Sequence, residues 1–74
     1  MAEKDESLLE VARRRVTEAE ARVKDQAARL ADAIRWGQDA AQAKAVLDVF
    51  EGTLRFLQED LARLEAEEAT RRQP

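Results

Sequence analysis

The stretch "IRWGQDAAQAKAVL", residues 34–47, decides how the chain folds, because it places a glycine and then an aspartate between two long helix-forming segments. Glycine adopts positive φ without a steric penalty and often ends a helix in that conformation. Asp39 is a good N-cap two residues beyond Gly37, and Gln42 stands where a capping box needs a side chain that bonds back to the cap. We therefore predict a helix over about residues 7–36, a turn at 37–39 and a helix over about 40–70.

The alternative to this hairpin is one continuous helical rod of roughly 60 residues, since an interior glycine costs only about 1 kcal/mol relative to alanine. The fresh capping pattern at Asp39, directly after Gly37, argues against the rod. A hairpin also allows two arms of similar length to cover each other's apolar residues from end to end.

The first predicted helix begins with a capping box formed by Ser7 and Glu10, with Asp5 as a competing cap. Its apolar residues recur every seven positions, and a second set is expected to fill the alternate turns. The first set is Leu9, Val16, Val23 and Leu30, and the second is Ala12, Ala19, Ala27 and Ile34.

The second predicted helix has the clearer pattern, because its large apolar residues alternate spacings of three and four. They are Leu47, Phe50, Leu54, Leu57, Leu61 and Leu64. If opposite positions have numbers that sum to about 77, small Ala27 faces large Phe50, as close packing favours. Gly52 lies inside this helix, either because a neighbouring helix approaches too closely for a side chain or because the helix tolerates a small destabilisation.

Composition indicates an all-α chain forming a single small domain, residues 1–74. The sequence has no cysteine or histidine, so a disulfide and the usual ligands of structural zinc are absent. Charged residues make up 39% of the chain, yet the net charge of −3 gives no strong attraction to nucleic acid or an anionic membrane. The N-terminal segment does not resemble a signal peptide, and no run of about 18 apolar residues occurs, so we expect a cytoplasmic protein without membrane contact.

The residue types present argue against an enzyme. Without histidine, cysteine or tyrosine, proton transfer or nucleophilic attack would fall to carboxylates, lysines or isolated hydroxyls. A carboxylate-bridged iron pair needs Glu-x-x-His motifs, and no glycine-rich phosphate loop is present. We therefore predict no catalytic, cofactor-binding or metal-binding residues and no cofactor.

Many charges form patterns typical of solvated helix surfaces. Acidic residues stand four positions before basic ones at Glu18 and Arg22, at Asp25 and Arg29, and at Glu68 and Arg72, among others. Such pairs stabilise a helix by only about 0.2–0.5 kcal/mol each. We interpret these charged residues as lying on solvent-exposed sides of the helices.

An arginine-rich end is the first candidate partner contact. The predicted hairpin brings one run of arginines close to a pair near the other end of the chain. These residues are Arg13, Arg14, Arg15, Arg71 and Arg72. The functional interpretation of this cluster is a nucleic-acid interface. Neighbouring glutamates and the lack of a nearby aromatic residue argue against it.

Trp36, just before the turn, is the second candidate partner contact. The structural interpretation is a lid that closes the end of the core over Ala40 and Ala43. The functional interpretation is an aromatic anchor for a protein partner at the turn.

A surplus of apolar residues on the second helix predicts self-association. We call the set Val46, Val49, Gly52, Thr53 and Phe56 the apolar flank. Some ten large core side chains contribute roughly 15–30 kcal/mol, whereas ordering each residue costs about 1–2 kcal/mol, so an isolated hairpin is marginal. We predict a homodimer in which two hairpins dock through the apolar flank as a four-helix bundle. Close approach of the second hairpin would explain why position 52 is a glycine.

Part of the second helix resembles a known group of proteins. Gly37, Asp39, Ala43, Val46, Leu47, Phe50, Thr53 and Leu54 follow a pattern similar to G-x-D-x3-A-x2-L-L-x2-F-x2-T-L. It resembles that of small, uncharacterised bacterial helical-hairpin proteins, over about 18 residues. Those proteins often have histidines after the last leucine, where this chain has Arg55, Phe56 and Leu57. The resemblance implies the hairpin and no assigned activity.

These observations predict a non-catalytic protein–protein interaction or scaffold module, built as a coiled-coil-like antiparallel hairpin that dimerises and binds an unknown protein partner. The alternative is a small nucleic-acid-associated regulator that uses the arginine-rich end. A third hypothesis is an inhibitor that opens and exchanges helices with a larger regulator.

Overall fold

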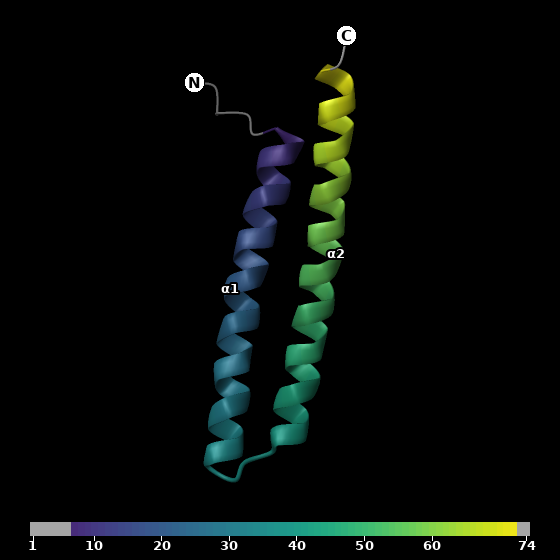
Figure 1. The fold of residues 1–74 in the computed structure, drawn as a ribbon. Helices are drawn as coiled ribbons and strands as arrows, with labels where there is room; N and C mark the ends of the chain where they lie inside the picture. Colours follow the sequence, from purple (N-terminus) through teal and green to yellow (C-terminus); the bar gives the residue numbers. More distant parts are fainter. Residues whose placement is uncertain (1–6, 73–74) are drawn as a thin grey trace, which may run out of the picture.

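The computed structural model describes residues 7–72, which form two antiparallel α-helices lying side by side (Figure 1). Helix α1 spans Leu8–Arg35 and helix α2 spans Ala40–Arg72. The start of α1 and the end of α2 lie at one end of the hairpin, which we call the open end, and the connection lies at the other. The predicted two-helix hairpin is confirmed, the continuous rod is excluded, and α2 ends two residues later than predicted.

The first turn of α1 is held by the predicted capping box. Ser7 is the N-cap, and its hydroxyl oxygen accepts a hydrogen bond from the backbone N–H of Glu10 at 3.1 Å. The Glu10 carboxylate accepts one from the backbone N–H of Ser7, also at 3.1 Å. Two otherwise unpaired donors are thereby satisfied. The competing cap, Asp5, lies outside the described residues.

The chain reverses at Gly37, as predicted, because this glycine adopts a φ of +69°. Gln38 N–H donates to the carbonyl of Ala33 at 2.8 Å, and Gly37 N–H donates to that of Ile34 at 3.4 Å. These two bonds form a Schellman motif, which satisfies carbonyls left unpaired at a helix end. The Asp39 carboxylate then accepts from Gln42 N–H at 3.0 Å and caps α2.

The face of α1 that packs on α2 follows an unbroken alternation of three and four residues. Ala12, Val16, Ala19 and Ala33 are buried, and Leu9, Val23, Gln26 and Leu30 are half-buried. The predictions for Ala27 and Ile34 are wrong, because both are exposed. Counting sevens from Ala19 leads to Gln26 and Ala33, whereas Ala27 and Ile34 lie about 100° further around the helix.

All six large residues of the predicted α2 stripe are half-buried, so this stripe is confirmed: Leu47, Phe50, Leu54, Leu57, Leu61 and Leu64. No residue of α2 is buried, whereas α1 has four buried residues, three of them small alanines.

The helices pair in a register close to the predicted one. Arg13 reaches Glu65 across the hairpin at 3.9 Å, and Ala33 lines a shared hollow with Ala43 near the turn. The predicted contact of Ala27 with Phe50 is wrong because Ala27 is exposed, and Phe50 lines a groove with Ala19 instead.

Candidate interaction face

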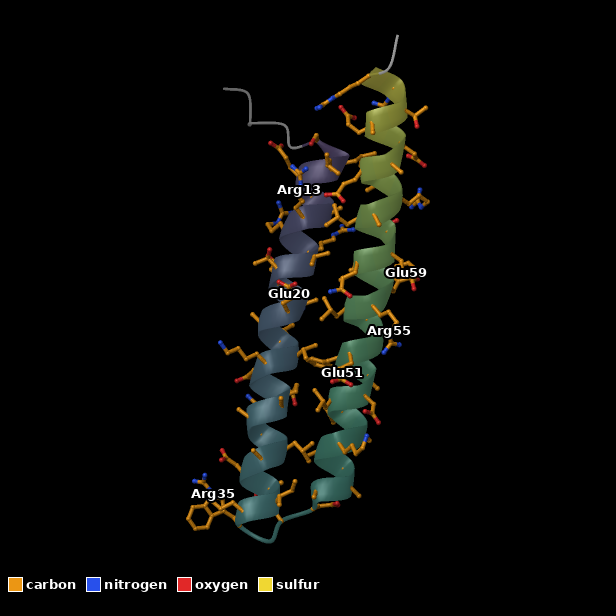
Figure 2. The ribbon with its side chains drawn as sticks, viewed as in Figure 1. Arg13, Glu20, Arg35, Glu51, Arg55 and Glu59 are labelled. Atoms are coloured by element: carbon orange, nitrogen blue, oxygen red, sulfur yellow. The ribbon has the colours of Figure 1, made fainter. Side chains whose placement is uncertain are left out.

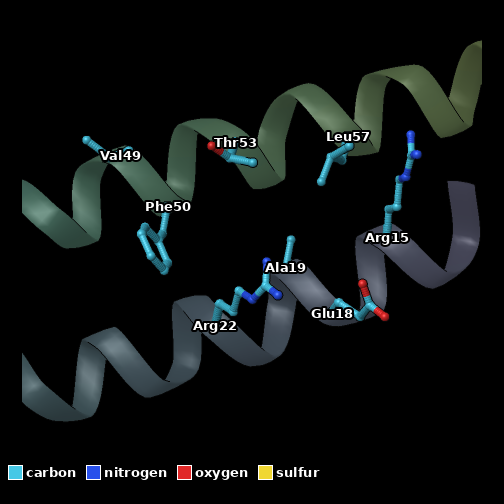
Figure 3. Close-up of a pocket in the computed structure, with 8 residues that line it drawn as sticks. All are labelled: Arg15, Glu18, Ala19, Arg22, Val49, Phe50, Thr53 and Leu57. Atoms are coloured by element: carbon cyan, nitrogen blue, oxygen red, sulfur yellow. The ribbon is translucent and has the colours of Figure 1, made fainter.

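An open groove runs between the two helices on one side of the hairpin (Figure 3). Its lining residues are Arg15, Glu18, Ala19 and Arg22 from α1 and Val49, Phe50, Thr53 and Leu57 from α2. Figure 3 shows Phe50 pointing from α2 toward α1, and Arg15 reaching from α1 toward α2. We call this side of the hairpin the groove face.

Large apolar side chains gather on the groove face although it faces solvent. Val49 and Phe56 are 64% and 66% exposed, and they lie seven residues apart on α2. Val46 and Thr53, also seven apart, stand between them and the core. Val46 lines a second hollow on the same side, nearer the turn. The predicted apolar flank therefore forms one continuous strip beside the groove.

Gly52 belongs to this strip and is a helix-interior residue, as predicted. A Cβ built on it would meet no atom within 4 Å outside its own stretch of helix. Close approach by α1 is therefore not the reason for a glycine here. Two explanations remain, which are contact with a second chain and simple tolerance.

The α1 side of the groove is charged rather than apolar. Arg15 and Arg22 lie one heptad apart along the groove, with Glu18 between them. Among residues 7–72, neither of these two arginines forms an ion pair. Further along the same row, Asp25 and Arg29 pair at 3.3 Å, as their spacing predicts.

Leu8 and Trp36 extend the row of Arg15, Arg22 and Arg29 to the two ends of α1, because all five positions are seven residues apart. Trp36 is 68% exposed and Leu8 is 76% exposed. The lid interpretation of Trp36 is therefore wrong, since a side chain this exposed does not close the core. Its role as an anchor for a partner stays a prediction.

The opposite face of the hairpin is mainly polar (Figure 2). Arg13 and Glu65 bridge the helices there, and Glu51 lies on the same row of α2 as Glu65. Arg55 and Glu59 extend from α2 away from α1. Ile34, 65% exposed, is the one large, strongly exposed apolar residue of this face within the described chain.

The predicted arginine-rich end is only partly assembled. Arg13, Arg71 and Arg72 line one hollow at the open end, together with Glu10, Glu67 and Glu68. Glu68 pairs with Arg71 at 3.5 Å and with Arg72 at 3.4 Å. Arg14 pairs with Glu18 at 3.8 Å, while Arg15 lies in the groove. Successive helical residues point about 100° apart, so the arginine run is spread around α1.

Other kinds of site receive no support from the geometry. Within residues 7–72, no three acidic side chains lie close enough together to hold a metal ion. Neither helix, over the described residues, contains a segment long and apolar enough to cross a membrane.

Comparison of the chain with models of protein families, with curated proteins and with solved structures gave no match. The resemblance of residues 37–54 to small bacterial hairpin proteins therefore stays a prediction.

The charged side of the groove is what sequence reasoning missed. The sequence patterns explain Glu18 and Arg22 only as a solvated pair, and Arg15 only as part of an arginine-rich end. A signal is nevertheless present in the sequence, because Arg15, Arg22 and Arg29 run parallel to the core row Val16, Val23 and Leu30.

Proposed function

We propose that the protein is a non-catalytic scaffold for protein–protein interaction, and that it works as a homodimer docked through the apolar flank in a four-helix bundle. The observation that carries this proposal is the strip beside the groove, where Val49 and Phe56 are about two-thirds exposed on a regular helix. A cytoplasmic location and a protein partner for the assembled bundle belong to the same proposal.

The thin core of the hairpin supports self-association. Among the described residues only four are buried, and three of them are alanines, which bring little apolar surface out of water. Full burial of a Val or Phe side chain contributes about 1.5–3 kcal/mol, so covering Val49 and Phe56 in both chains adds substantially to a small domain's stability. Oligomerisation is a common route to stability for chains of this size that have no disulfide or metal.

Phe56→Glu tests the proposal by placing a charge at the most exposed large side chain of the apolar flank. We expect the wild-type protein to be a dimer at micromolar concentration by sedimentation equilibrium, and the variant to have a dissociation constant raised roughly tenfold or more. The matched control is Ile34→Glu, because Ile34 is equally exposed but lies on the opposite face. A wild-type protein that is folded and monomeric at micromolar concentration would overturn the proposal.

Nucleic-acid binding remains the alternative, but no observation favours it. Arg13, Arg71 and Arg72 are accompanied by glutamates at the open end, and Arg13 itself pairs with Glu65. This mixture of charges leaves no uniformly basic surface for a phosphate backbone among the described residues.

A further inference from the structure

We infer that the two hairpins of the proposed dimer dock antiparallel, with α2 on α2 and α1 on α1, and that a ladder of alternating charges along α1 fixes this arrangement. The inference rests on the self-association proposed above and adds its geometry, its partner residues and its symmetry axis.

The ladder runs along the side of α1 that borders the groove face, where Arg15, Glu18 and Arg22 line the groove and Arg29 lines the second hollow. Basic and acidic residues alternate there at spacings of three and four: Arg15, Glu18, Arg22, Asp25, Arg29 and Asp32. All six are exposed. A row that alternates in sign is complementary to its own antiparallel copy when the two are displaced so that unlike charges meet.

Two-fold symmetry allows two ways of docking the groove faces. With the axis parallel to the helices, α2 of one copy covers α1 of the other, so Val49 and Phe56 would face the charged row. With the axis perpendicular to the helices, the apolar flank meets its own copy and the charged row meets its own copy. The second arrangement avoids burying Arg22 or Asp25 against apolar side chains, which is costly without a partner charge.

One position of the perpendicular axis gives favourable contacts both between the two α2 helices and between the two α1 helices. Suppose that Val49 of one copy lies opposite Phe56 of the other, so that the axis passes between Gly52 and Thr53. Gly52 then lies at the closest approach of the two α2 helices, where nothing in its own chain would meet a Cβ. Two helices can approach most closely where a side chain is absent.

The register of the hairpin carries the same axis onto α1. The hollow shared by Ala33 and Ala43 and the ion pair of Arg13 with Glu65 set the Gly52–Thr53 level within residues 23–26 of α1. We place the axis between residues 23 and 24, the position in this range at which unlike charges of the two copies meet. Residues equally far from that level on either side then meet across the axis. Arg22 meets Asp25 of the other copy, Glu18 meets Arg29, and Arg15 meets Asp32. Each pair joins unlike charges, and Arg22 and Arg15, unpaired among the described residues, both gain a carboxylate.

The same axis brings the exposed end residues of α1 together. Trp36 of one copy lies level with Val11 of the other and close to its Leu8. All the large, strongly exposed apolar residues that the structure describes on the groove face are then covered, which are Leu8, Trp36, Val49 and Phe56. The two turns lie at opposite ends of the dimer, so the assembly displays two identical ends, as a scaffold that joins two copies of one partner requires.

Charge exchange between two variants tests the ladder. Arg22→Glu sets a new carboxylate against Asp25 of the other copy, and Asp25→Arg sets a new guanidinium against Arg22 of the other copy, so we expect each homodimer to weaken roughly tenfold. A mixture of the two variants has only unlike charges at these contacts, so we expect the heterodimer to form with about the wild-type affinity. An effect confined to one helix cannot produce this recovery, because neither chain regains its own charge pair.

The controls are Lys24→Glu and Glu20→Arg, which change the charge of α1 by the same amounts at exposed positions away from the groove face. We expect neither to alter dimerisation by more than about twofold. Native mass spectrometry of the mixtures counts homodimers and heterodimers directly. Thr53→Cys is a second probe, since the chain has no other cysteine and oxidation should join two copies across the axis.

The outcomes separate this inference from the proposed function. If the wild-type protein dimerises and Phe56→Glu dissociates it, but the mixed charge variants show no preference for the heterodimer, the antiparallel ladder is wrong and the scaffold proposal stands. If Thr53→Cys forms no disulfide-linked dimer under oxidation while the wild-type protein is dimeric, the axis position is wrong. If the wild-type protein is monomeric, both fail.

Discussion

Gly37 holds a φ of +69°, whereas Gly52 lies inside α2 with open space around the position of a Cβ. The first glycine is required by the backbone, since an L-residue in the left-handed region costs about 1–2 kcal/mol. The second is not required by anything within the hairpin. The same residue type thus ends one helix and weakens the other.

We expect Gly37→Ala to lower the free energy of unfolding by about 1 kcal/mol, because alanine resists the left-handed conformation that the turn needs. Urea unfolding followed by circular dichroism measures this change. The matched variant is Gly52→Ala in the Phe56→Glu background, at a concentration where that background is monomeric, and we expect it to gain roughly 0.5–1 kcal/mol from helix propensity. Equal effects of the two substitutions would contradict these different roles.

Helix α1 keeps a regular alternation of core positions through its whole length, and this regularity places a polar residue in the core. Gln26 is half-buried between Val23 and Leu30, while Ala27 beside it is exposed. A glutamine at such a position buries less apolar surface than a leucine would, so the contact between α1 and α2 is weakest there.

Gln26→Leu should stabilise the hairpin by about 1 kcal/mol, because an apolar side chain would then fill a half-buried core position. Ala27→Leu is the control, since the added side chain would lie in solvent and change stability by less than about 0.5 kcal/mol. Thermal unfolding of both variants beside the wild-type protein measures the difference. Greater stabilisation by the Ala27 variant would show that the core of α1 follows the other set of positions.

The hairpin has two unlike faces, and under the proposed function this contrast, rather than the net charge of −3, decides which partner docks on it. The groove face combines an apolar flank on α2 with alternating charges on α1, while the opposite face is mostly polar. If this mixed face is complementary to its own copy, as we propose, it favours a second hairpin over a partner of uniform charge.

We expect the dissociation constant for duplex DNA at low salt to be no lower than about 100 µM, because glutamates neutralise the arginines of the open end. Glu68→Gln frees Arg71 and Arg72 from their common partner and serves as the sensitised comparison. Fluorescence anisotropy at two salt concentrations measures both proteins. Micromolar binding by the wild-type protein that weakens steeply with added salt would favour the nucleic-acid alternative.

The sequence by itself determined the features that depend on neighbouring residues. These features depend on residues within a few positions of one another along the chain. They are the capping box of Ser7 and Glu10, the turn at Gly37, the cap at Asp39 and the apolar stripe of α2. Such contacts involve local backbone geometry and helical periodicity, which can be recognised without knowing what packs on the helix.

Only the tertiary structure decided which side of each helix the remaining residues occupy. It exposed Ala27, Ile34 and Trp36, because the contact with α2 holds α1 in one rotational setting, and a one-residue difference in counting rotates a side chain by about 100°. It also placed Arg15 and Arg22 beside Val49 and Thr53. That alignment joins residues far apart in the chain, and it follows from the register of two packed helices, which no local pattern specifies.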